Sequence, residues 1–270
     1  MSKRIAFIGG GNMASALIGG LIKQGYAPGH IDVVEPFAEA QEKLKNSYGV
    51  VIHAQPAMFL AQAKLVVWAI KPQTFKDAAL QVRFHTKTAL HLSVAAGIRS
   101  DSIARWLDTE RVVRAMPNTP ALIGKGITAL FARPAATTQD KDWIGQVIAS
   151  TGELLWLAAE DQLDAVTALS GSGPAYMFYF MEAMTEAGTQ MGLTREQAQK
   201  LAVATVIGAG ELARASTESP EVLRQRVTSK GGTTYAAITS MDKSNIKNLF
   251  MQALHAAQIR AQEMGKEFGG

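Results

Sequence analysis

The chain has 270 residues, a mass of 28.9 kDa and a formal net charge of +4; 47% of its residues are hydrophobic, 19% are charged and none is cysteine. This length and composition predict about two domains with a sizeable core, and exclude a disordered chain held open by its own charge. The lack of cysteine excludes disulfides, thiolate nucleophiles, zinc fingers and iron–sulfur clusters.

The first part of the chain alternates short β-branched runs with helical runs. We predict strands at residues 4–9, 31–35, 50–53, 65–70, 88–95, 111–114, 128–132 and 153–157. We predict helices between them, at residues 13–24, 38–48, 75–82, 101–107 and 139–150. Such alternation with short connections predicts parallel βαβ units, and therefore an α/β fold with a doubly wound (Rossmann) parallel sheet covered by helices on both faces.

After about residue 158 the pattern becomes helical. We expect helices at residues 161–169, 174–191, 194–215, 220–227, 233–241 and 243–267. Asp242 is the expected cap of the last one. The change of pattern predicts two domains, residues 1–158 and 159–270. The helix at 174–191 is apolar on nearly all sides, so we expect a second subunit to cover part of it.

A glycine-rich turn follows the first predicted strand and opens the first helix. Residues 9–14 read GGGNMA, which has the form G-x-G-x-x-[G/A]. In such a motif Gly9 allows the tight turn, Gly11 lets the backbone approach a pyrophosphate, and Ala14 keeps the helix close to the sheet. The helix N-terminus offers free N–H groups to the phosphates. The pattern predicts a dinucleotide site, with a purely structural turn as the alternative.

Glu35 ends the second predicted strand, about 20 residues beyond the glycines, where dinucleotide-binding folds place a ribose-binding carboxylate. A carboxylate there accepts hydrogen bonds from the ribose hydroxyls and repels a 2′-phosphate, which favours NADH. Lys43 and Lys45 lie downstream of it, and a solvated carboxylate before Pro36 is the other interpretation. The choice between NADH and NADPH therefore stays open.

Three further loops follow predicted strands, at the edge where doubly wound sheets bind ligands. They are Ala69-Ile70-Lys71-Pro72-Gln73, Ala95-Ala96-Gly97 and Met116-Pro117-Asn118-Thr119-Pro120. Their small residues leave room for a flat ring, and Lys71 can reach a phosphate or a developing negative charge. Each loop alone is compatible with ordinary loop chemistry, but together they favour a nicotinamide pocket.

The helical part contains two glycine-rich turns that enter helices, at residues 170–174 and 228–234. The second reads TSKGGTT and offers consecutive N–H groups and hydroxyls, which suit a small carboxylate. Each turn alone is also compatible with an ordinary connection between helices, capped by Ser or Thr.

Over essentially its full length the chain resembles the pyrroline-5-carboxylate reductase family. The motifs that carry the resemblance are, in order, FIGGGNMASALIGGL, AIKPQ, SVAAGI, RAMPNTP, LSGSGPAY, and TSKGGTT followed by AAITSMD. The resemblance implies reduction of the cyclic imine 1-pyrroline-5-carboxylate to L-proline by NADPH or NADH, the last step of proline biosynthesis. It implies a dinucleotide-binding domain at 1–158 and an all-helical substrate and dimerisation domain at 159–270. It also implies a homodimer or a decamer of dimers, in which the helical loop of one subunit helps to close a neighbour's site.

The resemblance also implies site residues. The cofactor would be bound by Ile8, Gly9, Gly10, Gly11, Asn12, Met13, Ala69, Ile70, Lys71, Pro72, Ala95, Ala96 and Gly97. Gly232, Thr233 and Thr234 would hold the substrate carboxylate, and Asn118 would shape the other end of the substrate. Thr234 and Lys71 are the candidate catalytic residues. We expect solvent or a Thr- or Ser-bound water to supply the proton, with Lys71 as the alternative donor. Lys230 stands where the family often has proline.

Two other classes of protein compete with this interpretation. A β-hydroxyacid-type dehydrogenase usually has a catalytic lysine on the helix after the domain junction, whereas the helix from Pro174 has none and Lys200 lies on the next one. A non-catalytic dinucleotide-sensing protein would not need the 228–234 loop. We expect no metal, no nucleic-acid partner and no membrane segment, because Lys/Arg clusters and apolar runs of about 20 residues are both missing. A cytoplasmic location is expected, since the first residues do not look like a secretory signal.

Overall fold

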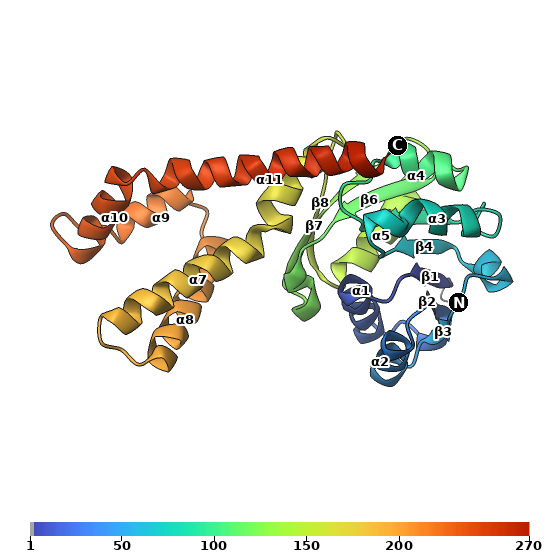
Figure 1. Ribbon diagram of the computed structural model, residues 1–270, viewed down its shortest axis with the longest axis horizontal. Helices are drawn as coiled ribbons and strands as arrows, with labels where there is room; N and C mark the ends of the chain where they lie inside the picture. The colour runs from blue at the N-terminus through green and yellow to red at the C-terminus, as the bar shows by residue number, and fades with distance from the viewer. Residues whose placement is uncertain (1–2, 270) are drawn as a thin grey trace. The chain divides into compact units, whose positions relative to one another are not determined.

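The computed structural model describes residues 3–269, and its first part is built around an eight-stranded sheet (Figure 1). The strands are β1 (Ile5–Ile8), β2 (Ile31–Val34), β3 (Val51–His53), β4 (Leu65–Trp68), β5 (Leu90–Ser93), β6 (Val112–Met116), β7 (Gly126–Ala132) and β8 (Gly152–Trp156). Their order in the sheet is β3-β2-β1-β4-β5-β6-β7-β8, so β1 lies between β2 and β4. The predicted doubly wound sheet is confirmed.

All neighbouring strands of this sheet run parallel except β6 and β7, which are antiparallel. Only residues 117–125 connect these two strands. A parallel neighbour needs a crossover of about a dozen residues or more, usually a helix, so the chain can only turn back here. The expectation of purely parallel pairing is corrected at this one position.

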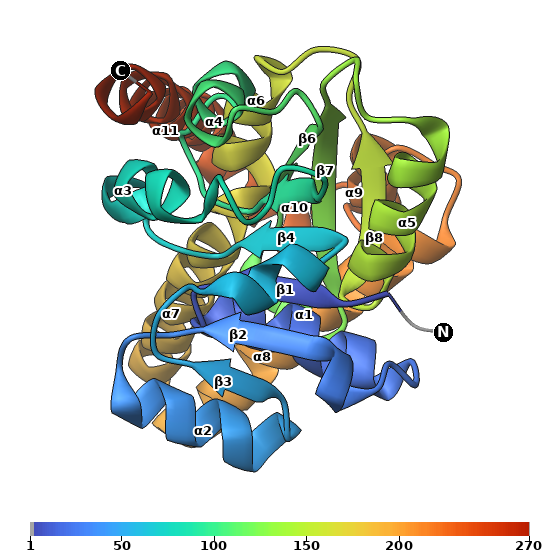
Figure 2. The same cartoon turned by 90° about the vertical axis from the view of Figure 1, so that its right-hand side faces the viewer.

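Helices cover both faces of the sheet (Figure 2). One face packs against α1 (Asn12–Lys23), α2 (Ala38–Tyr48) and α5 (Thr138–Ala149), and the other against α3 (Pro72–Val82) and α4 (Ser100–Leu107). In β1, Ile5 and Phe7 enter the first core and Ala6 and Ile8 the second. Successive residues of a strand point to opposite faces, so a strand buried on both faces is apolar throughout.

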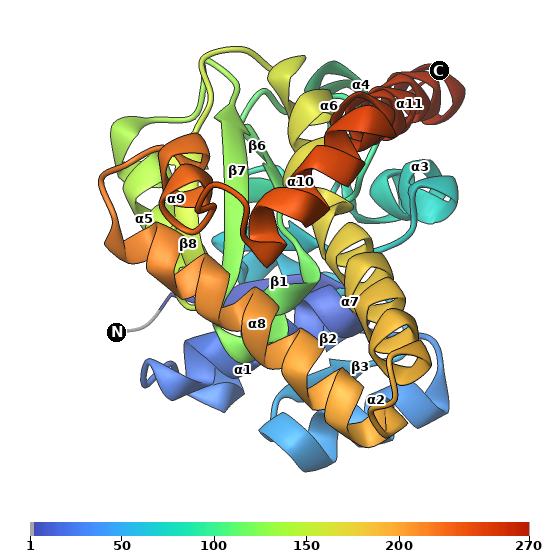
Figure 3. The same ribbon diagram turned by 90° about the vertical axis from the view of Figure 1, so that its left-hand side faces the viewer.

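The helical part contains α6 (Gln162–Val166), α7 (Gly173–Gln190), α8 (Arg195–Ala215), α9 (Pro220–Arg226), α10 (Thr233–Lys243) and α11 (Ile246–Phe268). Helices α7 and α8 lie side by side (Figure 3). A π-helical turn at Thr167–Gly171 separates α6 from α7. The predicted cap at Asp242 is wrong, because Asp242 lies inside α10 and the chain leaves the helical conformation at Asn245, whose φ is 56°.

By internal packing the chain divides into two compact units. The first runs to Ser172 and also includes the chain from Ala257 onward, and the second is Gly173–Ala256. The last turns of α11 therefore belong to the first unit. A functional division at residue 158 stays a prediction. Within residues 3–269, no helix has both the length and the apolar character of a membrane span.

His91 in β5 gives the fold a predicted sensitivity to acid. The imidazole is fully buried, and its Nδ1 accepts a hydrogen bond of 3.1 Å from Trp68 Nε1. Burial lowers the pKa of His91 to about 4. The unfolded chain takes up a proton below about pH 6.5 whereas the folded chain does not, so the unfolding free energy falls as the pH drops from about 6.5 to about 4.

The lowered pKa of His91 corresponds to a change of at most about 3 kcal/mol in the unfolding free energy. Urea unfolding of the wild type and of His91→Gln, followed between pH 7.5 and 4.5, measures this contribution. We expect a shallower pH dependence in the variant, whatever its absolute stability. Equal slopes for the two proteins would contradict the assignment to His91.

Candidate active site

A cavity of about 1010 Å³ opens at the carboxyl ends of β1 to β4. Residues 8–11, 34–37, 54–56 and 69–71 line it, together with Thr74, Ala78, Gln81 and Val82 of α3. The strand order reverses between β1 and β4, and open α/β sheets bind ligands at such a switch point. The topology therefore marks this cavity as the candidate binding site.

The three glycines between β1 and α1 have different surroundings. Gly9 has φ of 94°, and a Cβ on it would lie 2.5 Å from the carbonyl oxygen of Ala69. A Cβ on Gly10 would collide with the Leu44 side chain. At Gly11 nothing lies within 4 Å of the corresponding position. The first two glycines are thus required by close packing, whereas Gly11 leaves space open for a ligand.

The N-terminus of α1 faces this space without a cap. Gly11 is the N-cap residue, no side chain caps the helix, and its first turn contains no acidic residue. The first intrahelical bond runs from Ser15 N–H to the Gly11 carbonyl, so the N–H groups of Asn12 and Met13 have no acceptor in the helix. Open N–H groups and the helix dipole suit a phosphate, so the turn fits the pyrophosphate of a dinucleotide.

Glu35 lies directly after β2 and is only 6% exposed. Its Oε2 accepts a hydrogen bond of 2.8 Å from Gly10 N–H, and its Oε1 accepts one of 3.0 Å from Phe37 N–H. The carboxylate thus holds the glycine turn and the entry to α2. Each oxygen keeps a further acceptor position, so Glu35, which lines the cavity, can also accept from a ribose hydroxyl.

The predicted loops after β4 and β5 are placed differently. Ala69, Ile70 and Lys71 line the large cavity, and Lys71 is the exposed N-cap residue of α3 with Pro72 as its first residue. The loop Ala95–Gly97 follows the neighbouring strand β5 and does not line this cavity. Gly97 borders a second cavity of about 550 Å³ instead. The large cavity therefore brings together the predicted residues at the ends of β1, β2 and β4 only.

Asn118 lies in the connection between β6 and β7. Its side-chain Oδ1 accepts a hydrogen bond of 3.0 Å from Ile127 N–H, which fixes the loop. The Nδ2 group of the amide is then left as the donor for any ligand.

The predicted carboxylate-binding residues form the start of α10 in the second unit. Gly232 is the N-cap residue, and no side chain caps the helix. The first intrahelical bond runs from Ala236 N–H to the Gly232 carbonyl, so the N–H groups of Thr233 and Thr234 have no acceptor within the helix. This open helix start suits a small carboxylate.

Part of the cavity wall was not predicted from the sequence. Phe37, residues 54–56 and Thr74 line it, and Phe37 is 72% exposed. A signal in the sequence is the aromatic Phe37, two residues after the predicted ribose-binding position at Glu35. Within residues 3–269, no group of three or more His, Cys, Asp or Glu side chains is placed to hold a metal ion.

The doubly wound sheet and the open start of α1 after its glycine turn are typical of dinucleotide-dependent oxidoreductases. Two family models match, "NADP oxidoreductase coenzyme F420-dependent" over residues 4–97 and "Pyrroline-5-carboxylate reductase dimerisation" over residues 160–264. The pyrroline-5-carboxylate reductase of Pseudomonas aeruginosa is 43% identical over 268 residues, covering 98% of both chains. The chain belongs to the pyrroline-5-carboxylate reductase family. Its predicted cofactor class, NADPH or NADH, is confirmed.

Other relatives agree with this membership. The pyrroline-5-carboxylate reductase of Pisum sativum is 36% identical, covering 97% of this chain and 96% of the relative. The solved structure of the Coxiella burnetii enzyme is 38% identical with a TM-score of 0.91, covering 98% of this chain and 99% of that one. The Plasmodium falciparum enzyme, solved with NADP bound, is 26% identical with a TM-score of 0.88, covering 98% of both chains.

Proposed function

We propose that this chain reduces 1-pyrroline-5-carboxylate to L-proline with NADPH or NADH, the last step of proline biosynthesis. The observation that carries the proposal is the family match, which spans 98% of the chain and includes both the sheet and the helical part. The test is to incubate the purified protein with reduced dinucleotide and the imine, and to follow the loss of the reduced-nicotinamide absorbance. If the absorbance does not fall, the chain would instead be a non-catalytic dinucleotide-sensing protein. If only carbonyl substrates of the hydroxyacid type are reduced, it would be a β-hydroxyacid-type dehydrogenase.

For the cofactor, we assign the pyrophosphate to residues 8–13 and the ribose to Glu35. Ala69–Pro72 and Ala95–Gly97 border the rest of the dinucleotide, with the second loop on the nicotinamide side. Lys71 is exposed at the start of α3, where its charge is available to a phosphate. When bound, the reduced cofactor supplies the hydride.

For the substrate, we assign the carboxylate to the N–H groups at Gly232–Thr234 and to the Thr234 hydroxyl. Asn118 donates through its side-chain amide to the other end of the ring. A protonated imine carbon is already electrophilic, so these residues mainly orient it and exclude water. Because Lys71 is solvent-exposed rather than shielded, a water molecule is the preferred proton donor and Lys71 the alternative.

Thr234→Ala is expected to raise KM for the imine about tenfold or more, because a hydrogen bond to a charged group is lost. KM for the dinucleotide is expected to stay unchanged. Steady-state kinetics with each substrate varied in turn measure both constants. Thr234→Ser keeps the hydroxyl and should behave like the wild type, whereas an unchanged imine KM in Thr234→Ala would remove Thr234 from the site.

A homodimer, alone or as the unit of a decamer, is part of the same proposal. Phe178 and Tyr179 on α7 are 62% and 70% exposed in the single chain. Large neighbouring aromatics are typical of the core of a protein interface. Phe178→Glu is therefore expected to shift the protein from dimer to monomer in light scattering at micromolar concentration. A dimer of wild-type stability in this variant would place the interface elsewhere.

A further inference from the structure

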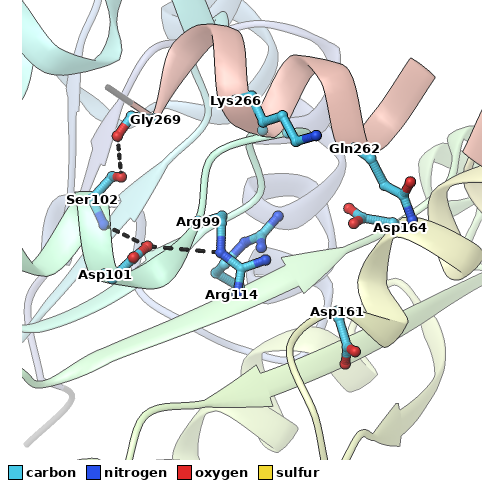
Figure 4. A pocket seen from close by; sticks show the side chains of 11 residues that line it. Arg99, Asp101, Ser102, Arg114, Asp161, Asp164, Gln262, Lys266 and Gly269 are labelled. Carbon is cyan, nitrogen blue, oxygen red and sulfur yellow. Dashed lines mark hydrogen bonds and ion pairs between the residues drawn. The ribbon is translucent and has the colours of Figure 1, made fainter. Parts of the chain in front are cut away.

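The end of the chain packs against the loop that follows β5. We call residues 257–269 the C-terminal clasp. Within it, Ala261 is 3% exposed and Phe268 packs against the core formed by α3 and α4. The carbonyl oxygen of Gly269 accepts a hydrogen bond of 2.5 Å from Ser102 Oγ (Figure 4). It accepts a second one of 3.0 Å from Arg105 Nη2. The clasp is therefore anchored on α4, which begins three residues after Gly97.

Gly97 is the point where the clasp meets the loop. Its φ is 75°, and a Cβ built on it would lie 2.8 Å from Met264 Cβ and 3.5 Å from Met264 Cε, so the end of the Met264 side chain also lies against Gly97. A Cβ on Gly265 would lie 3.4 Å from the Gly97 carbonyl oxygen. Gly97 therefore has no room for a Cβ, and the Met264 side chain packs directly against its backbone and limits its position.

Open space also borders this contact. The cavity of about 550 Å³ is lined by Gly97 and Arg114 and, from the clasp, by Gln262, Gly265 and Lys266 (Figure 4). A loop next to open space is not fixed by close packing on every side. Met264→Ala keeps Cβ but removes the rest of the side chain, including Cε, and would therefore leave Gly97 room to shift toward the space that Cε fills.

We propose that Met264 is a positioning residue for the nicotinamide end of the cofactor. Its contact with Gly97 fixes the loop Ala95–Gly97, and through this loop the clasp sets how tightly the nicotinamide ring is held. The inference rests on the proposed function, which places this loop at the nicotinamide. The adenosine end is independent of the clasp, because residues 8–11 and 34–37 line a cavity to which no clasp residue contributes.

The two ends of the cofactor can be tested separately with a nicotinamide-free fragment. Dissociation constants are measured for the dinucleotide that the wild type binds more tightly, and for the matching fragment, ADP-ribose or its 2′-phosphate. For Met264→Ala we expect the dinucleotide to bind about fivefold more weakly, or about 1 kcal/mol, and the fragment to bind as in the wild type. If Met264 had only a structural role, its replacement would weaken the binding of both the dinucleotide and the fragment, or of neither.

Three further variants complete the experiment. Met264→Leu keeps the bulk against Gly97 and should restore wild-type binding. Glu263→Ala, on an exposed residue whose side chain pairs with Arg260, is the matched control and should change neither constant. Ser102→Ala removes one anchor of Gly269 and should reproduce the pattern more weakly, which keeps the test valid if Met264→Ala does not fold.

Equal weakening of dinucleotide and fragment, or no weakening of either, in both Met264→Ala and Ser102→Ala would overturn the positioning role. Failure of the proposed function has a different signature, because the wild type itself would then not reduce the imine.

Discussion

Gly11→Leu is expected to weaken dinucleotide binding at least about 100-fold, or about 3 kcal/mol, without destabilising the protein. Nothing lies within 4 Å of the Cβ position of Gly11, so the folded chain can accommodate a side chain there. The same side chain would occupy the cavity in front of the uncapped start of α1, where the pyrophosphate is assigned. Fluorescence titration gives the dissociation constant, and thermal unfolding gives the stability.

Two other glycines serve as controls for this result. Gly29 also has nothing within 4 Å of its Cβ position but lies outside the cavity, so Gly29→Leu should bind dinucleotide normally. Gly9→Ala should lose stability as well as binding, because its φ of 94° and the nearby Ala69 carbonyl leave no room for a Cβ. Retained binding in Gly11→Leu would place the pyrophosphate elsewhere.

The features that the sequence predicts correctly are those with a local signal. The apolar run of β1, Ile5–Ile8, is followed at once by three glycines and an apolar helix, and each of these has its own pattern. The alternation of strands and helices then gives the sheet, since right-handed crossovers leave few arrangements. The open start of α10 is equally local, because Gly232 and the two threonines are adjacent in the chain.

The features that escape prediction depend on distant contacts. The hydrogen bond from Gly10 to Glu35 joins residues 25 positions apart, and the bond from Ser102 to Gly269 joins residues 167 apart. No local pattern shows that the end of α11 returns to the first unit, or that Met264 meets Gly97. The antiparallel direction of β7 follows from the short connection between β6 and β7. The sequence contains this signal, but the regular alternation of strands and helices before it favoured a parallel strand.

Glu35→Ser is expected to change the preference between NADH and NADPH by about 30-fold in favour of NADPH. Loss of a charged acceptor weakens binding of the unmodified ribose by about 1.5–3 kcal/mol, and loss of the negative charge removes repulsion of a 2′-phosphate. Glu35 also holds Gly10 N–H and Phe37 N–H, so the substitution loosens the turn for both cofactors. This common effect cancels in the ratio of the dissociation constants for NADH and NADPH. Titration of the wild type and of the variant with both cofactors measures this ratio.

Glu35→Gln separates the charge of Glu35 from its hydrogen bonds. The amide keeps one oxygen that can accept from Gly10 N–H but carries no charge, so this variant should show most of the change in preference with less loss of NADH affinity. Repulsion between Glu35 and a 2′-phosphate should also weaken with salt, because the Debye length is about 10 Å at 0.1 M and about 3 Å at 1 M. The ratio of the NADH to the NADPH affinity of the wild type should therefore shift toward NADPH as the salt concentration rises, while that of Glu35→Gln should not. If both cofactors weaken equally in both variants and salt leaves the ratio unchanged, Glu35 acts only as the support of the Gly10 turn.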